Sequence, residues 1–138
     1  MRVVLDTNII ISGLLSESGP PAKLLRLWLE GRFELVTSRA QLDELSRVFA
    51  YKKIRERISP EQASDFLSHV DSLAVVLKKL PSVDYSPDPD DNAIIATALE
   101  SGAKFLVSGD KSDLLALKKV KSIPILTARR AVNRFKKP

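Results

Sequence analysis

The chain has 138 residues, of which 44% are hydrophobic and 28% charged, a composition typical of one ordinary globular domain. It contains no cysteine, which excludes disulfides, thiolate zinc sites and a cysteine nucleophile. The net charge is +5, from 22 Lys and Arg against 17 Asp and Glu, so the chain carries an excess of basic residues.

The apolar pattern predicts short strands that alternate with helices. In chain order, the strands are expected at residues 3–5, 33–36, 73–77, 105–107 and 123–126. The helices are expected from residue 9, over 20–30, 38–50, 60–72, 92–101 and 112–117, and after Thr127. Two of them begin with the spacing of a capping box, Ser38 with Gln41 and Ser59 with Gln62. This order predicts a single α/β domain over residues 1–138, with three α/β/α layers and a five-stranded, mostly parallel sheet.

Basic residues cluster in the sequence between Arg47 and Arg57, around residues 118–121, and over residues 129–137. Such clusters attract nucleic acids, but they also keep protein surfaces soluble, so charge favours nucleic-acid contact without deciding it. No run approaches the ~18 apolar residues of a membrane span. Because a strand pattern begins at the second residue, we expect no signal peptide, no membrane contact and a cytoplasmic location.

Two of the predicted strands are followed by an aspartate. Asp6 comes directly after residues 3–5, and Asp110 follows residues 105–107 through Ser108 and a glycine. The carboxyl ends of parallel strands form the edge at which open α/β folds bind ligands. Each aspartate also has a structural interpretation, since Asp6 could cap the helix that follows it and Asp110 could pair with Lys111.

A third aspartate, Asp91, shares one helical stripe with the apolar residues at 94, 95, 98 and 99. The stripe predicts that Asp91 faces the sheet at the amino end of a helix, where the helix dipole favours a negative charge. The neighbouring Asp88 and Asp90 are better explained by capping and by loop solvation.

Two further acids are weaker candidates. Glu44 lies on the flank of the apolar face of the helix at 38–50, where glutamates are usually solvated, and Asp43 beside it competes for the same role. Asp113 could cap a helix, accept a hydrogen bond from Lys111, or join the acidic residues.

Several ionised carboxylates cannot share a pocket without compensation. Two of them about 6 Å apart repel by roughly 3 kcal/mol at an effective dielectric constant near 20. A divalent cation would offset this repulsion, and oxygen ligands without His or Cys favour Mg²⁺ or Mn²⁺. Such a cation suits phosphoryl transfer because it polarises the phosphate.

Four segments, in this order, resemble the motifs of the PIN domain. They are residues 3–8 (VVLDTN), 38–45 (SRAQLDEL), 88–98 (DPDDNAIIATA) and 106–115 (LVSGDKSDLL). The resemblance spans essentially the whole chain and is strongest to the VapC-like proteins of bacterial and archaeal toxin–antitoxin pairs. It implies a Mg²⁺- or Mn²⁺-dependent ribonuclease that hydrolyses phosphodiester bonds of RNA, with a small antitoxin protein and a second copy of the chain as partners.

The resemblance also assigns residues. It places Asp6, Glu44, Asp91 and Asp110 as the catalytic and metal-binding acids, with Asp113 as a less regular fifth. Thr7, Asn8 and Ser108 match the polar residues that support these acids, and Ser108 keeps the hydroxyl of the more usual threonine. From charge clustering, the candidates for binding the RNA backbone are Arg47, Lys52, Lys53, Arg55 and Lys111.

Other interpretations stay open at this point. A non-catalytic RNA-binding or scaffolding module would have the same acids. A phosphatase that uses Asp6 as a nucleophile would want a second acid two residues on, where Asn8 stands. A Ser-His-Asp triad would need His69, which is far in sequence from the acidic motifs. Trp28 is expected in the core rather than at an interface.

Overall fold

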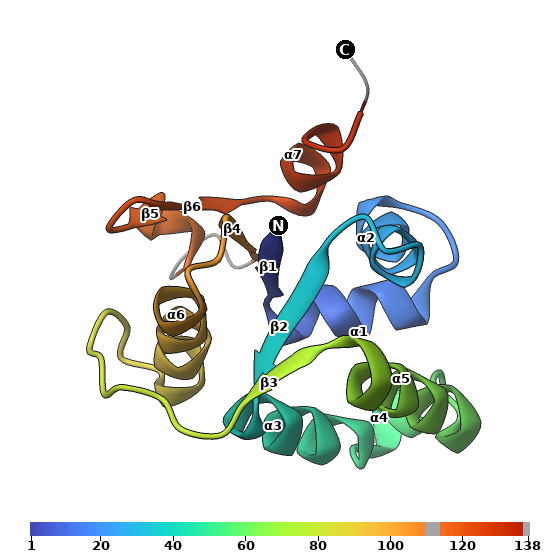
Figure 1. The fold of residues 1–138 in the computed structure, drawn as a ribbon. Helices are drawn as coiled ribbons and strands as arrows, with labels where there is room; N and C mark the ends of the chain where they lie inside the picture. The colour runs from blue at the N-terminus through green and yellow to red at the C-terminus, as the bar shows by residue number, and fades with distance from the viewer. Residues whose placement is uncertain (110–113, 137–138) are drawn as a thin grey trace.

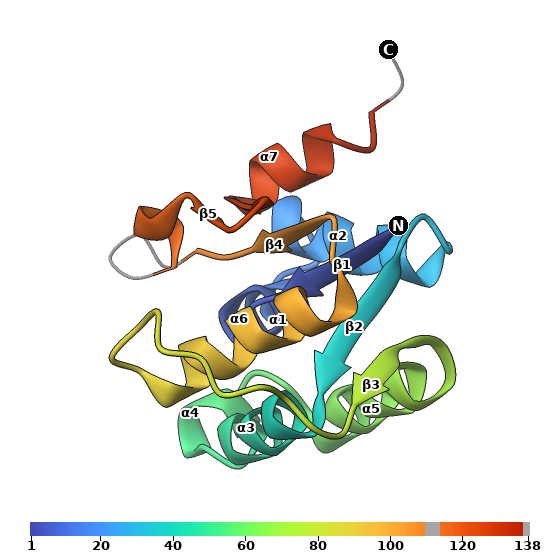
Figure 2. The same cartoon turned by 60° about the vertical axis from the view of Figure 1, so that its left-hand side comes forward.

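The computed structural model describes residues 1–109 and 114–136, and within them a six-stranded sheet carries helices on both faces (Figures 1 and 2). The strands are β1 (Arg2–Leu5), β2 (Glu34–Ser38), β3 (Val75–Leu77), β4 (Phe105–Val107), β5 (Lys119–Val120) and β6 (Ile123–Leu126). Their order is β3-β2-β1-β4-β6-β5, and only the β5–β6 pair is antiparallel. The predicted α/β class and mostly parallel sheet are therefore confirmed.

The prediction of five strands was wrong by one, because it missed β5. Lys119 and Val120 pair with Pro124 and Ile123 in a hairpin at the edge of the sheet. The hairpin turn contains Lys121 at φ 53°, a left-handed conformation that usually selects Gly or Asn. The sequence therefore had no turn signal here, and these residues were interpreted only as a basic cluster.

The helices are α1 (Thr7–Leu15), α2 (Pro20–Leu29), α3 (Arg39–Phe49), α4 (Lys52–Arg55), α5 (Pro60–Leu73), α6 (Pro89–Ser101) and α7 (Ala128–Asn133), with a 3₁₀ turn η1 at Leu115–Leu117. The short α4 was not predicted, and α6 begins three residues before the expected position, at Pro89 after the capping Asp88. Among the described residues, no helix is long and apolar enough to cross a membrane.

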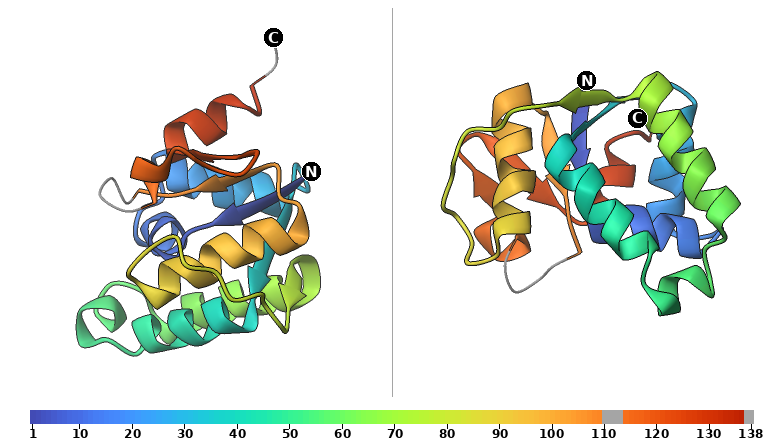
Figure 3. Two further views of the ribbon diagram at one scale, coloured as in Figure 1. Left: turned by 90° about the vertical axis from the view of Figure 1, so that its left-hand side faces the viewer. Right: turned by 90° about the horizontal axis from the view of Figure 1, so that it is seen from below.

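Successive residues of each strand point to opposite faces of the sheet, so the sheet separates two hydrophobic clusters. Val3 and Leu5 of β1 pack in a cluster with side chains of α1, α2, α3, α5 and α7. Val4 packs on the other face, where α6 contributes Ile94 and Ile95. Figure 3 shows α6 across the sheet from α1 and α2. The sequence alternation within a single strand thus produces the layered fold.

Two predictions about single residues are also resolved by the fold. Trp28 is 2% exposed and packs edge-to-face on Phe66, with 5.8 Å between ring centroids, so its assignment to the core is confirmed. His69 is exposed on α5 and lines a cavity with residues of α1 and α2, away from the acidic motifs. The structure therefore gives no support to a histidine-based triad.

Candidate functional site

The carboxyl ends of β1, β2 and β4 meet at one edge of the sheet, which we call the acid edge. Asp6 follows β1, and its backbone N–H donates to the Val107 carbonyl of β4 at 2.8 Å. Ser38 ends β2, and Ser108 follows β4. The parallel pairing therefore brings together the residues that follow β1 and β4, although they lie about a hundred positions apart in the sequence.

Asp6 is buried at this edge, with 6% of its surface exposed. Its carboxylate Oδ2 accepts a hydrogen bond of 2.9 Å from the hydroxyl of Ser108. Asp6 occupies the position that precedes α1, yet its side chain makes no capping bond to the helix backbone. Capping therefore does not explain this buried carboxylate, although the amino end of α1 still favours a negative charge there.

Glu44 of α3 also faces the acid edge. The hydroxyl of Thr7 donates to Glu44 Oε1 at 2.5 Å. Burial raises the pKa of Glu44, the Thr7 bond opposes this shift, and the negative charges of Asp90, Asp6 and Asp88 raise the pKa further. Glu44 therefore shares one region of negative potential with Asp6 and with the start of α6. The competing Asp43 is exposed and pairs with Arg39 instead.

Asp91 lies in the first turn of α6 and is 9% exposed, so its predicted place on the buried stripe is confirmed. Its Oδ2 accepts a hydrogen bond of 3.1 Å from the hydroxyl of Ser86. The amide of Asn92 fixes the same loop, since its oxygen accepts from the N–H groups of Tyr85 and Ser86 and its nitrogen donates to the Ser86 carbonyl. The loop before α6 is thus tied to the helix turn that carries Asp91.

Sequence reasoning missed Ser86, Asn92 and Gln41. Ser86 lies between the strand expected at 73–77 and the helix expected at 92–101, and Asn92 was expected only as the first residue of that helix. Gln41 was assigned to a capping box, but only half of that box forms, because the Gln41 N–H donates to the Ser38 hydroxyl while the Gln41 side chain points elsewhere. Its amide is 2% exposed and donates to the carbonyl of Leu5 at 2.7 Å.

The described acids alone do not form a complete metal site. Within residues 1–109 and 114–136, no three Asp, Glu, His or Cys side chains lie close enough together to hold a metal ion. Asp110, Lys111 and Asp113 lie outside the described residues. Asp6 and Glu44 at the acid edge, and Asp91 at the start of α6, nevertheless each accept a hydrogen bond from a hydroxyl, and such oxygen donors fit a hard divalent cation.

The remaining candidates lie on the surface. Arg47, one helical turn after Glu44, forms an ion pair with Asp90 at 3.5 Å. The side chains of Lys52, Lys53 and Arg55 are exposed on α4, and Asn8 is exposed in the first turn of α1.

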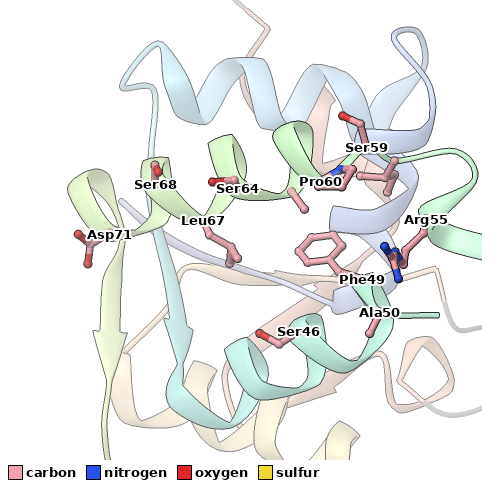
Figure 4. Close-up of a pocket in the computed structure, with 12 residues that line it drawn as sticks. Ser46, Phe49, Ala50, Arg55, Ser59, Pro60, Ser64, Leu67, Ser68 and Asp71 are labelled. Atoms are coloured by element: carbon pink, nitrogen blue, oxygen red, sulfur yellow. The ribbon is translucent and has the colours of Figure 1, made fainter. Parts of the chain in front are cut away.

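A large cavity lies away from the acids, in the groove between α3 and α5 (Figure 4). It has a volume of about 710 Å³, and its lining includes Phe49, Ile58 and Leu67 together with several serines. None of the acids assigned from the sequence lines this groove, although Arg55, a candidate for binding the RNA backbone, does.

Comparisons with known proteins agree with this fold. The chain is 33% identical over 119 residues to the uncharacterized protein MJ1680 of Methanocaldococcus jannaschii, covering 86% of this chain and 76% of that protein. Its fold is similar to a chain of VapBC2 from Rickettsia felis, solved bound to a DNA fragment from their promoter. The TM-score is 0.59 and the identity 18%, over 92% of this chain and 98% of the other. The model of one family, the PIN domain, matches residues 2–112, so this chain belongs to the PIN domain family.

Proposed function

We propose that this protein is a divalent-metal-dependent ribonuclease that hydrolyses phosphodiester bonds of RNA and acts as the toxin of a toxin–antitoxin pair. The observation that carries the proposal is the pairing of Thr7 with Glu44 beside the buried Asp6. It brings the acid that follows β1 and an acid of α3 into one negative region at the end of the sheet where α/β folds bind ligands. Membership of the PIN domain family supports a nuclease activity.

In this proposal Asp6, Glu44 and Asp91, together with Asp110, hold Mg²⁺ or Mn²⁺, and Asp113 is an additional candidate. When bound, the cation supplies charge compensation and polarises the phosphate. The chain itself orients the carboxylates, because Ser108, Thr7 and Ser86 each donate a hydrogen bond to one of them.

The exposed basic residues bind the RNA backbone. Arg47 is the best placed, since it lies one turn from Glu44 on α3 and beside the start of α6. Lys52, Lys53 and Arg55 extend the positive charge along α4, and Lys111 is a further candidate. A small antitoxin protein is a proposed partner, supported by the fold that the chain shares with a VapBC2 protein. A second copy of the chain is a further proposed partner.

Cleavage of RNA tests the proposal. The unsubstituted chain should cleave single-stranded RNA with Mn²⁺, and EDTA or Asp6→Asn should abolish the cleavage. Asp43→Asn is the matched control, because it removes an exposed carboxylate from α3 that pairs only with Arg39 among the described ion pairs, and it should cleave normally. If the unsubstituted chain and Asp6→Asn bind a range of RNAs equally but cleave none, the protein is a non-catalytic RNA-binding module instead.

A further inference from the structure

A hydrogen-bonded network of polar side chains lies directly beneath the acid edge. Its members come from three elements, with Thr37 on β2, Gln41 and Glu44 on α3, and Thr7 on α1. Thr37, Gln41 and Thr7 are each no more than 3% exposed. Buried polar groups are costly unless they are hydrogen-bonded, so the pattern of bonds among these residues restricts where each proton can lie.

The orientation of the Gln41 amide follows from one contact. The Leu5 carbonyl, at the end of β1, can only accept a hydrogen bond, so the Gln41 atom 2.7 Å away must be the nitrogen Nε2. The amide oxygen then faces Thr37, whose hydroxyl donates to it at 2.5 Å. The side chain therefore has a single orientation in which both of its ends are satisfied.

The second hydrogen of Gln41 Nε2 faces the oxygen of Thr7, in a longer contact of 3.4 Å. A hydroxyl that accepts a hydrogen bond from this side must direct its own single proton elsewhere. The Thr7 proton is directed to Glu44 Oε1, where it forms the 2.5 Å bond. In these three hydrogen bonds the donors thus follow one direction, from Thr37 through Gln41 and Thr7 to the carboxylate of Glu44.

We infer that Gln41 is a positioning residue, which directs the Thr7 hydroxyl toward Glu44 and so holds that carboxylate at the acid edge. This inference rests on the proposed function, in which Glu44 binds the metal. Gln41 touches neither substrate nor metal, and it acts through Thr7. Hydrogen bonds that orient carboxylate ligands in this way usually change metal affinity about 10- to 100-fold when they are removed.

A double-mutant cycle on Mn²⁺ binding tests the inference, using the full chain, Mn²⁺ alone and isothermal titration calorimetry. Gln41→Met keeps the approximate volume of the side chain but removes its donors and acceptor, while Thr7→Val removes the hydroxyl between Gln41 and Glu44. Each should weaken Mn²⁺ binding about tenfold. Because both act on Glu44 through the same bond, the double variant should bind no more weakly than the weaker-binding single variant.

Two controls separate positioning from general stability. Thr7→Ser keeps the hydroxyl and should keep the Mn²⁺ affinity of the unsubstituted chain. Thr97→Val removes an equally buried hydroxyl, which bonds to the Ala93 carbonyl of its own helix, and it should leave Mn²⁺ affinity unchanged even if the unfolding temperature falls. If Gln41→Met does not fold, Thr37→Val replaces it, since that change leaves the amide oxygen without its donor and should also weaken Mn²⁺ binding.

The outcomes are distinguishable. Unchanged Mn²⁺ affinity in folded Gln41→Met, or in Thr37→Val where it takes its place, would overturn the role of Gln41 and leave the proposed nuclease intact. Effects of Gln41→Met and Thr7→Val that multiply in the double variant would overturn it too, because the two residues would then act independently. If the unsubstituted chain does not bind Mn²⁺, the proposed function itself fails, and the inference fails with it.

Discussion

Freeing Arg47 from its ion pair should strengthen RNA binding. Arg47 Nη2 lies 3.5 Å from Asp90 Oδ1, and the two side chains are 58% and 46% exposed. An ion pair so open to solvent contributes about 0.2–1 kcal/mol, which corresponds to a change in affinity of up to about fivefold. Asp90→Asn removes this competitor for the guanidinium and one negative charge beside Glu44, so it should raise RNA affinity by up to about that factor.

The assay is fluorescence anisotropy of a labelled single-stranded RNA in EDTA, which prevents cleavage, over a range of salt concentrations. Arg47→Gln should weaken binding and lower the slope of log affinity against log salt by about 0.7, the value for one phosphate contact on a single strand. In the Arg47→Gln background, Asp90→Asn should raise affinity much less than it does alone.

The pair of Arg39 and Asp43 provides a matched control on the same helix. It has a similar separation of 3.6 Å and similar exposure of 62% and 63%, but Asp43 is not among the charges that raise the pKa of Glu44. Asp43→Asn should therefore change RNA affinity less than Asp90→Asn. Equal gains in RNA affinity from Asp90→Asn and Asp43→Asn would refute the reasoning. A full gain from Asp90→Asn in the Arg47→Gln background would refute it too, because the effect would then come only from the change in net charge.

Three further predictions concern stability. Because the pKa of Glu44 is raised in the folded chain, the native state binds the carboxyl proton more readily than the unfolded state does. The stability of the fold therefore falls as the pH rises above 4.5, the ordinary pKa of a glutamate. Glu44→Gln should therefore raise the thermal unfolding midpoint at neutral pH, and this gain should disappear below pH 4.5. A difference in midpoint between the variant and the unsubstituted chain that stays constant across the pH range would contradict the argument. Ser86→Ala removes the donor to Asp91 and the acceptor of the Asp88 N–H, so urea unfolding should show a loss of about 1–3 kcal/mol, together with weaker Mn²⁺ binding. Ser59→Ala breaks the complete capping box of α5 and should cost about 1 kcal/mol without affecting RNA cleavage; lost cleavage in a folded variant would show that α5 contributes to the site.

Local patterns in the sequence were sufficient to predict the burial of Asp91 and the order of the elements other than α4 and β5. The stripe from Asp91 to Leu99 is a property of a single helix, so no tertiary information was needed to place this aspartate toward the sheet. The strand ends that carry Asp6 and Ser108 were predictable for the same reason, since a parallel sheet aligns its carboxyl ends.

The hydrogen bonds that orient the acids could not be predicted from the sequence, because they depend on contacts between distant elements. Gln41 has the spacing of a capping residue, and only the packing of α3 against the end of β1 directs its amide to Leu5. Glu44 and Asp43 are adjacent in sequence and chemically alike, and the choice between them follows from the rotation of α3 about its axis. Ser86 contacts Asp91 only because Asn92 folds the preceding loop back onto α6.

The place of β1 in the middle of the sheet has a consequence for synthesis on the ribosome. Residues 2–5 pair on one side with β2 and on the other with β4, which follows about a hundred residues later. A nascent or proteolysed fragment that ends before residue 105 would keep one row of β1 backbone groups unpaired and open to association with other strands. It would also lack Ser108, the hydroxyl bonded to Asp6, so the acid edge assembles only after residue 108 has emerged.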